Sequence, residues 1–110
     1  MGPESSLAER AVDHARTLLI EAGNPSWAAL VQTPDGGFLT GPMVVARSDL
    51  ALQQGGALAG VVPDGALLVV GCERAGRQLR FTVLDGDGRR VLRRDEIVED
   101  AIGRPGSEIV

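Results

Sequence analysis

The spacing of hydrophobic and polar positions changes several times along the chain, and each change predicts a structural element. Apolar residues over Leu7–Leu19 recur every three or four positions, which is the period of an amphipathic helix. Gly23 and Pro25 would end this helix, because glycine accepts a left-handed cap and proline cannot continue the hydrogen-bond ladder. The pattern predicts a helix over Ser6–Ala22.

Two extended apolar segments follow, separated by residues typical of a tight turn. Trp27–Gln32 and Phe38–Val45 are apolar and strand-like, and Pro34–Gly37 between them has the composition of a turn. This arrangement predicts a β-hairpin.

A second helix is predicted to begin at Ser48 or Asp49, either of which can cap it, and to end at Gly60. Gly55 and Gly56 lie in its middle, where two glycines together cost about 2 kcal/mol relative to alanine. Such a pair indicates that the helix packs closely against a neighbour.

The last third of the chain predicts strands and a closing helix. Ala66–Val70 is continuously apolar, as in a central strand covered on both faces, and Arg77–Leu84 alternates like a more exposed strand. Arg90–Leu92 predicts a short strand and Asp95–Ile102 a terminal helix. We therefore predict one small layered α/β (α+β) domain over residues 1–110. One mixed sheet would pack with helices, in the order helix, two strands, helix, two or three strands, helix. Residues 1–5 and 106–110 are expected to be flexible.

Composition narrows the classes of protein to consider. A chain of 110 residues can bury one core, and no apolar run reaches the roughly 20 residues of a membrane helix. The N-terminus lacks a secretory pattern, so we expect a cytoplasmic protein without a membrane partner. Every basic residue is arginine, which is typical of GC-rich bacterial coding. Cys72 and His14 are the sole residues of their types, so we expect no disulfide, metal ion or cofactor.

The net charge and the local distribution of arginines point in different directions about a negatively charged partner. A net charge of −4 disfavours nucleic acid as a partner, because phosphate binding needs a positive field. A local positive face is nevertheless conceivable, with Arg74, Arg77 and Gln78 as possible ligand contacts. The alternative is a set of solvated strands and turns. Seven of the eleven arginines fall in one third of the chain: Arg74, Arg77, Arg80, Arg89, Arg90, Arg93 and Arg94.

Three segments carry a resemblance to a known family. They are the hairpin Ala29–Val44, the helix Leu50–Val61 and the terminal Leu84–Gly103, which combines an Asp-Gly-Asp-Gly turn with Asp-Glu-Ile-Val-Glu-Asp-Ala-Ile-Gly. In these segments the chain resembles the short-chain, homotetrameric cytidine deaminases. The resemblance implies the fold of those enzymes and subunits that assemble into oligomers.

The zinc-binding side chains of such deaminases are missing from the corresponding positions. The family places a Cys-Ala-Glu or His-Ala-Glu at the start of the second helix, where this chain has Ala51-Leu52-Gln53. Alanine has no donor atom, and the amide of Gln53 cannot exchange a proton near neutral pH. The family's Pro-Cys-x-x-Cys falls on Gly71–Gln78, which keeps Cys72 alone. The resemblance therefore implies a relative without zinc or deaminase chemistry.

A binding or assembly role fits this pattern, and small residues on the second helix are the candidate interface. A non-catalytic deaminase-like subunit would form a homo-oligomer, or a hetero-oligomer with a related active subunit. The same order of elements is similar to roadblock or longin-like scaffolds, which dimerise and bind regulatory GTPases. The candidate interface residues are Ala51, Gln53, Gly55, Gly56 and Ala59.

An enzymatic alternative remains open at this stage. Cys72 follows the predicted central strand, and Arg74 and Arg77 could lower the pKa of its thiol. His14, next to Asp13, is the sole imidazole available as its base. The alternative requires the first helix to bring His14 to Cys72.

Overall fold

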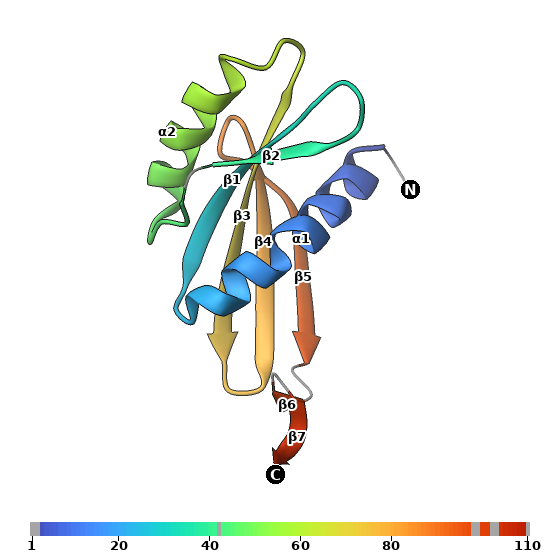
Figure 1. Cartoon of the computed structure of the whole chain (residues 1–110), viewed down its shortest axis with the longest axis vertical. Coiled ribbons are helices and arrows are strands. Elements are labelled where there is room, and N and C mark those ends of the chain that lie inside the picture. Colours follow the sequence, from blue (N-terminus) through green and yellow to red (C-terminus); the bar gives the residue numbers. More distant parts are fainter. Residues whose placement is uncertain (1–2, 42, 98–99, 102–103, 110) are drawn as a thin grey trace.

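In the computed structural model, two helices pack on opposite faces of a five-stranded sheet within the described part of the chain (Figure 1). The structure describes residues 3–41, 43–97, 100–101 and 104–109. The elements are α1 (Pro3–Ala22), β1 (Ser26–Gln32), β2 (Phe38–Thr40), α2 (Ser48–Ala59), β3 (Ala66–Ala75), β4 (Gln78–Asp85), β5 (Arg90–Ile97), β6 (Asp100–Ala101) and β7 (Arg104–Ile109). The predicted layered α+β class is confirmed.

The strands of the sheet follow the order β2-β1-β3-β4-β5, and every neighbouring pair is antiparallel. The predicted mixed sheet is wrong in this respect. Short turns join β3 to β4 and β4 to β5, and such turns connect antiparallel strands only. Gly76 adopts a φ of 61° in the first of these turns, a conformation that glycine takes without strain. β3 lies at the centre, as its apolar run predicts.

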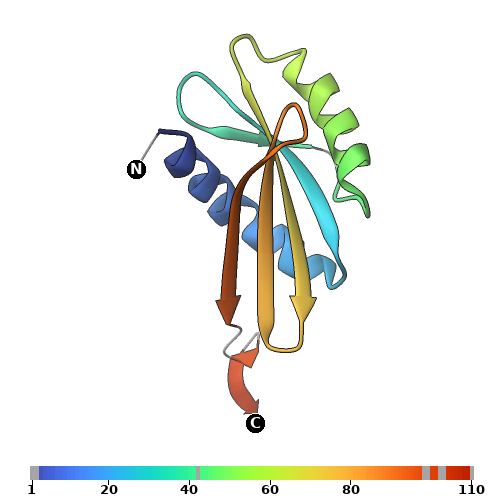
Figure 2. The same ribbon diagram turned by 180° about the vertical axis from the view of Figure 1, so that it is seen from behind.

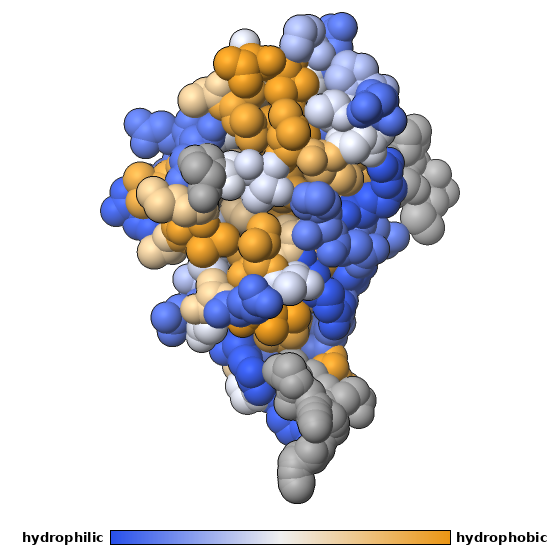
Figure 3. All heavy atoms as spheres, in the orientation of Figure 1, coloured by the Kyte–Doolittle hydropathy of each residue, from blue (hydrophilic) through white to orange (hydrophobic). Residues whose placement is uncertain are grey.

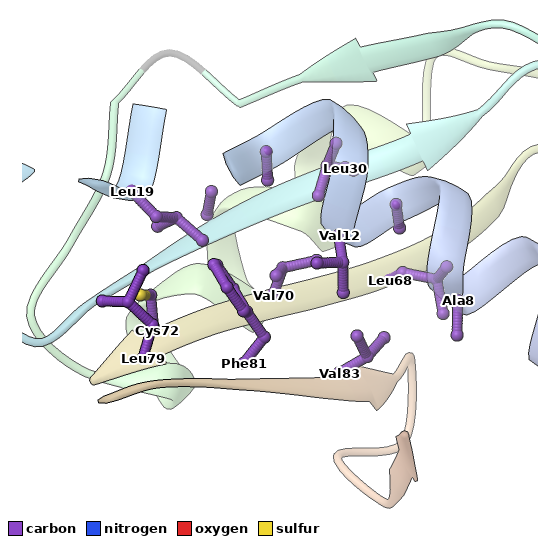
Figure 4. Packing of buried hydrophobic residues seen from close by; sticks show 13 residues of the cluster. Ala8, Val12, Leu19, Leu30, Leu68, Val70, Cys72, Leu79, Phe81 and Val83 are labelled. Atoms are coloured by element: carbon purple, nitrogen blue, oxygen red, sulfur yellow. The ribbon is translucent and has the colours of Figure 1, made fainter. Parts of the chain in front are cut away.

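The face of the sheet under α1 holds the main hydrophobic core. Alternate residues of β1, β3 and β4 point to this face, where the largest fully buried side chain is that of Phe81. Val83, on the same strand, and its partner Val70, on the neighbouring β3, are also fully buried (Figure 4). From the helix, α1 contributes the buried residues Ala8, Ala11, Val12, Ala15 and Leu19 at the predicted helical spacing.

The opposite face is only partly covered by α2. Among the described elements, α2 contacts β1 and β3 but neither β4 nor β5. Figure 2, which views this side, shows β4 and β5 with no helix in front of them. A Cβ atom on Gly55 would lie 2.4 Å from Leu67 Cδ1 and 3.2 Å from Ala29 Cβ. The glycine therefore permits the close helix packing that the sequence indicates.

The predicted terminal helix over Asp95–Ile102 is wrong where the structure describes it. Asp95–Ile97 belongs to β5, and Asp100–Ala101 forms β6 in a separate two-stranded hairpin with β7. Pairing with β4 overrides the local helical pattern: Arg80 Nε donates a hydrogen bond to Asp95 Oδ1 at 3.2 Å across the two strands. Residues 98–99 and 102–103 of the predicted segment lie outside the described residues.

The element boundaries also differ from the predictions. Arg47, rather than Ser48 or Asp49, occupies the N-cap of α2 and makes no side-chain cap bond. Strand β3 continues to Ala75, beyond the predicted end at Val70. Within the predicted flexible ends, α1 begins at Pro3 and β7 reaches Ile109, while residues 1–2 and 110 lie outside the described residues. Secondary structure does not measure mobility, so the predicted flexibility stays a prediction.

Candidate functional site

Cys72 lies in the core beneath the C-terminal part of α1. Its side chain is 6% exposed and packs in the same cluster as Leu19, Leu79 and Phe81 (Figure 4). A cavity of 40 Å³ adjoins it, lined also by the α1 end and by Arg74. Burial, followed by the negative charge of Glu96, raises the pKa of the Cys72 thiol. A raised pKa disfavours the thiolate, which is the nucleophilic form.

His14 lies against the short edge strand β2, away from the strand that carries Cys72. Its Nε2 is 3.1 Å from Thr40 Oγ1, and its ring centroid is 5.3 Å from that of Phe38. Strand β1 lies between β2 and β3. Asp13, the sequence neighbour of His14, accepts a hydrogen bond from Arg94 Nη2 at 3.0 Å. The structure does not bring the three side chains together, so the enzymatic alternative loses its geometric basis.

The two segments that would correspond to a deaminase zinc site face opposite sides of the sheet. Ala51 is fully buried on α2, on the side of Leu67 and Val69. Cys72 alternates with Leu67 and Val69 along β3, so its side chain points to the other face of the sheet, toward α1. Within the part of the chain described here, no three His, Cys, Asp or Glu side chains lie close enough together to hold a metal ion. The residues present therefore do not fit zinc.

The candidate interface residues on α2 divide into two groups. Ala51 and Gly55 are buried against the chain's own sheet and cannot contribute to a surface. Gln53 and Gly56 are exposed, and Ala59 is half-buried. A Cβ atom at Gly56 would meet no other heavy atom within 4 Å, so this glycine faces open space. Of the small residues of α2, Ala51 and Gly55 thus serve the packing of the helix on the sheet.

The arginines of the last third do not form one positive face. Arg74 Nε donates to Gly76 O at 3.1 Å, and this residue shares the α1 side of the sheet with its partner Leu79. Gln78 precedes Leu79 on β4, so its side chain points to the opposite face of the sheet, where it lines a hollow of 70 Å³ together with Arg80. Arg77 is exposed in the turn. The possible ligand contacts Arg74 and Gln78 are thus separated by the sheet.

Ion pairs neutralise several of the remaining arginines. On the α1 side, Arg94 Nε lies 2.9 Å from Glu96 Oε2, and Arg16 also pairs with Glu96. On the other side, Arg93 Nη2 lies 3.6 Å from Asp95 Oδ2. Figure 3 shows hydrophilic residues along the right side of the molecule, where α1 and β5 lie in Figure 1. These contacts favour the alternative prediction, in which the arginines lie on solvated strands and turns, over a positive face.

A third hollow, larger than the two already named, lies beside α2 and is predominantly apolar. It has a volume of 370 Å³ and is formed by the segment after β2 and by one side of α2. Met43 is 65% exposed there and Leu50 is 37% exposed. The sequence signal was the apolar run Met43–Val45, which the hairpin prediction had placed at the end of a strand over Phe38–Val45, whereas β2 ends at Thr40. The lining residues are Met43, Val45, Leu50, Gln53 and Gln54, and we call this feature the α2 groove.

Two further observations bear on the class of protein. Among the described residues, no helix combines the length and the apolar character needed to cross a membrane. Comparison with protein-family models, with curated proteins and with solved structures gives no match to this chain.

Proposed function

We propose that the chain is a non-catalytic, cytidine-deaminase-like domain that acts as an assembly or partner-binding subunit. The observation that carries this proposal is the placement of Ala51 and Cys72 on opposite faces of the sheet. A deaminase zinc ion needs ligands that converge on one point. In this chain Ala51 packs on one face of the five-stranded sheet, whereas Cys72, on strand β3, points to the other face.

The remaining surface features support a binding role. The α2 groove exposes the apolar side chains of Met43 and Leu50 next to the polar Gln53 and Gln54. Exposed apolar patches bordered by polar residues are typical of interaction sites. The groove accordingly gives the proposed subunit a surface for a partner.

The proposal is tested by native mass spectrometry and a cytidine deamination assay on the purified chain. We expect a metal-free species without turnover. A matched variant, Ala51→Cys combined with Gln53→Glu, restores one of the two missing ligands and the missing acid. We expect it to bind no zinc either, because Cys72, its second thiol donor, still points to the other face. Stoichiometric zinc together with deamination, in either protein, would overturn the proposal.

The scaffold alternative predicts a different result from the same material. A roadblock or longin-like domain would bind a small GTPase, which titration of the chain against such a GTPase detects. Specific binding that depends on the bound nucleotide would favour the scaffold over the deaminase-like subunit.

A further inference from the structure

Strand β2 forms one edge of the sheet, and its outer side is unpaired within the described part of the chain. Gly41 N donates to Ala29 O at 2.8 Å. Because hydrogen-bonded and non-bonded pairs alternate along an antiparallel ladder, Phe38 and Thr40 direct their backbone N–H and C=O groups away from β1. No described residue forms a backbone hydrogen bond to these outward groups. An open edge of this kind accepts an extended peptide as an additional strand.

The α2 side of this edge is apolar. Leu39 lies between Phe38 and Thr40, so its side chain points to the face of the sheet opposite α1, where it is 44% exposed. Met43 and Leu50 follow at the α2 groove and are also exposed. Three of the six exposed large apolar side chains among the described residues therefore border the β2 edge or the groove beyond it.

An unsatisfied hydrogen-bond acceptor lies at the same place. Gln54 lines the α2 groove, and its Oε1 is buried without a hydrogen-bond partner among the described residues. A Cβ atom on Gly41 would lie 2.8 Å from this oxygen, which places it beside the end of β2. Leaving a buried acceptor unpaired is unfavourable. A backbone N–H of a bound peptide would satisfy it once the side chain turns toward the groove, whereas a purely apolar ligand would not.

The α1 side of the edge is positively charged. Arg10 Nη2 donates to Gly36 O at 2.6 Å, and its guanidinium carbon lies 5.5 Å from the centroid of the Phe38 ring. One turn further along α1, His14 contacts Thr40. Arg10 is exposed and forms no ion pair with a described residue. An acidic side chain on the α1 side of an added strand would therefore supply its counter-charge.

We propose that the β2 edge and the α2 groove together bind an extended peptide of another protein, in which apolar residues alternate with acidic ones. This inference rests on the proposed function and names the class of partner. Successive side chains of a strand point to opposite faces, so the apolar residues would meet Leu39 and the groove while the acidic ones meet Arg10. Neither edge strand of the chain has this pattern, because β2 carries no acidic residue and β5 places charged residues on both faces. A second copy is therefore the poorer occupant.

The test is a fluorescence anisotropy titration of the labelled synthetic peptide Asp-Leu-Asp-Val-Asp-Leu-Asp with the purified chain. The control peptide Asp-Asp-Leu-Val-Leu-Asp-Asp has the same composition without the alternation, and we expect it to bind at least roughly tenfold more weakly. Two further versions carry N-methyl groups on alternate residues, in one phase or the other. One of them should lose binding and the other retain it, because alternate amides of an added strand face the edge. In the complex, the amide resonances of Phe38 and Thr40 should shift and exchange more slowly with solvent.

A charge reversal tests the contact with Arg10. Arg10→Glu should weaken binding of the acidic peptide by at least roughly tenfold, and a peptide with lysine in place of aspartate should restore it. Circular dichroism checks that the variant folds, and Arg10→Lys, which keeps the charge, is expected to retain binding. Leu39→Glu should weaken binding as well, whereas Ile97→Glu, at an exposed position on the opposite edge of the sheet, leaves it unchanged.

The possible outcomes separate this inference from the proposed function. Equal binding of the alternating and control peptides overturns the inference, and so does the absence of binding to either. Self-association of the chain that Leu39→Glu abolishes, without peptide binding, would make a second copy the occupant and also overturn it. In each of these cases a metal-free, inactive chain leaves the proposed function standing. Zinc binding with deamination would instead overturn the proposed function without changing the peptide titrations.

Discussion

The two faces of the central sheet are packed in different ways. Under α1, the large side chains of Phe81, Val70 and Val83 fill the space between helix and strands. Under α2, Gly55 allows the helix to approach Leu67 closely. The α1 face is thus most sensitive to the loss of side-chain volume, and the α2 face to its gain. Surface not needed for internal packing remains beside α2, which explains why the candidate interface lies there.

The largest expected effect comes from removing volume on the α1 face. Phe81→Ala should lower the free energy of unfolding by about 3–5 kcal/mol, because it leaves a cavity at a fully buried position. Urea denaturation followed by circular dichroism measures the loss. Ile97→Ala, at an exposed position, is the control and should change the value by less than about 0.5 kcal/mol. Equal effects of the two substitutions would refute the assignment of the core.

Adding a methyl group at Gly71 tests close packing on the α2 face of the sheet. An ideal Cβ there would lie 2.5 Å from Cε3 of Trp27, so the indole ring must move. We expect Gly71→Ala to cost about 1–3 kcal/mol of stability. Trp27 is the sole tryptophan, so its fluorescence spectrum should shift as well. Gly86→Ala is the control, since a Cβ at Gly86 comes no nearer than 3.7 Å to Leu67. An unchanged spectrum and stability in Gly71→Ala would contradict the packing of the indole on this strand.

The adjacent glycines of α2 sharpen the comparison further. Gly56→Ala adds a methyl group in open space and should stabilise the chain by up to about 1 kcal/mol through helix propensity. Gly55→Ala gains the same helix propensity, but its new methyl group meets Leu67 and Ala29. Its free energy of unfolding should therefore be lower than that of Gly56→Ala by about 1–2 kcal/mol. Thermal and urea denaturation of the two variants give the difference. Indistinguishable stabilities would mean that α2 does not pack against the sheet through Gly55.

The smallest expected effect concerns Cys72 and alkaline pH. Burial raises the pKa of its thiol in the folded chain, so the folded state favours the protonated form. The corresponding stability is fully present below the thiol's ordinary pKa of about 8.5 and is lost as the pH rises through the higher folded value. Unfolding free energy measured between neutral and alkaline pH should therefore decline more in the parent chain than in Cys72→Ala.

The same thiol provides an independent check on the enzymatic alternative. Because the thiolate is disfavoured, iodoacetamide should modify Cys72 slowly at neutral pH in the folded chain and rapidly after unfolding in urea. Fast modification of the folded protein would revive Cys72 as a candidate nucleophile.

Much of the fold follows from local patterns. The helical spacing over Leu7–Leu19 predicts α1, and the apolar run over Ala66–Val70 predicts a central strand, because in both cases the side chains that must be buried are close in sequence. The Gly55–Gly56 pair indicates close packing of α2. It does not reveal which glycine faces inward, since that depends on how the helix is rotated against the sheet.

Strand pairing decided what the sequence left open. Asp95–Ile97 follows a helical pattern locally, yet it pairs with β4 because the short turn after Asp85 directs the chain back along that strand. Likewise, the residues of the missing zinc site can be read from the sequence, whereas their separation cannot. The register of β3 turns Cys72 toward α1 and away from Ala51. The residues at positions 51–53 and 71–78 thus predicted, from the sequence alone, a chain without deaminase chemistry. Only the tertiary structure separated the two segments and left the α2 groove open, because side-chain direction and helix placement depend on contacts between residues distant in the chain.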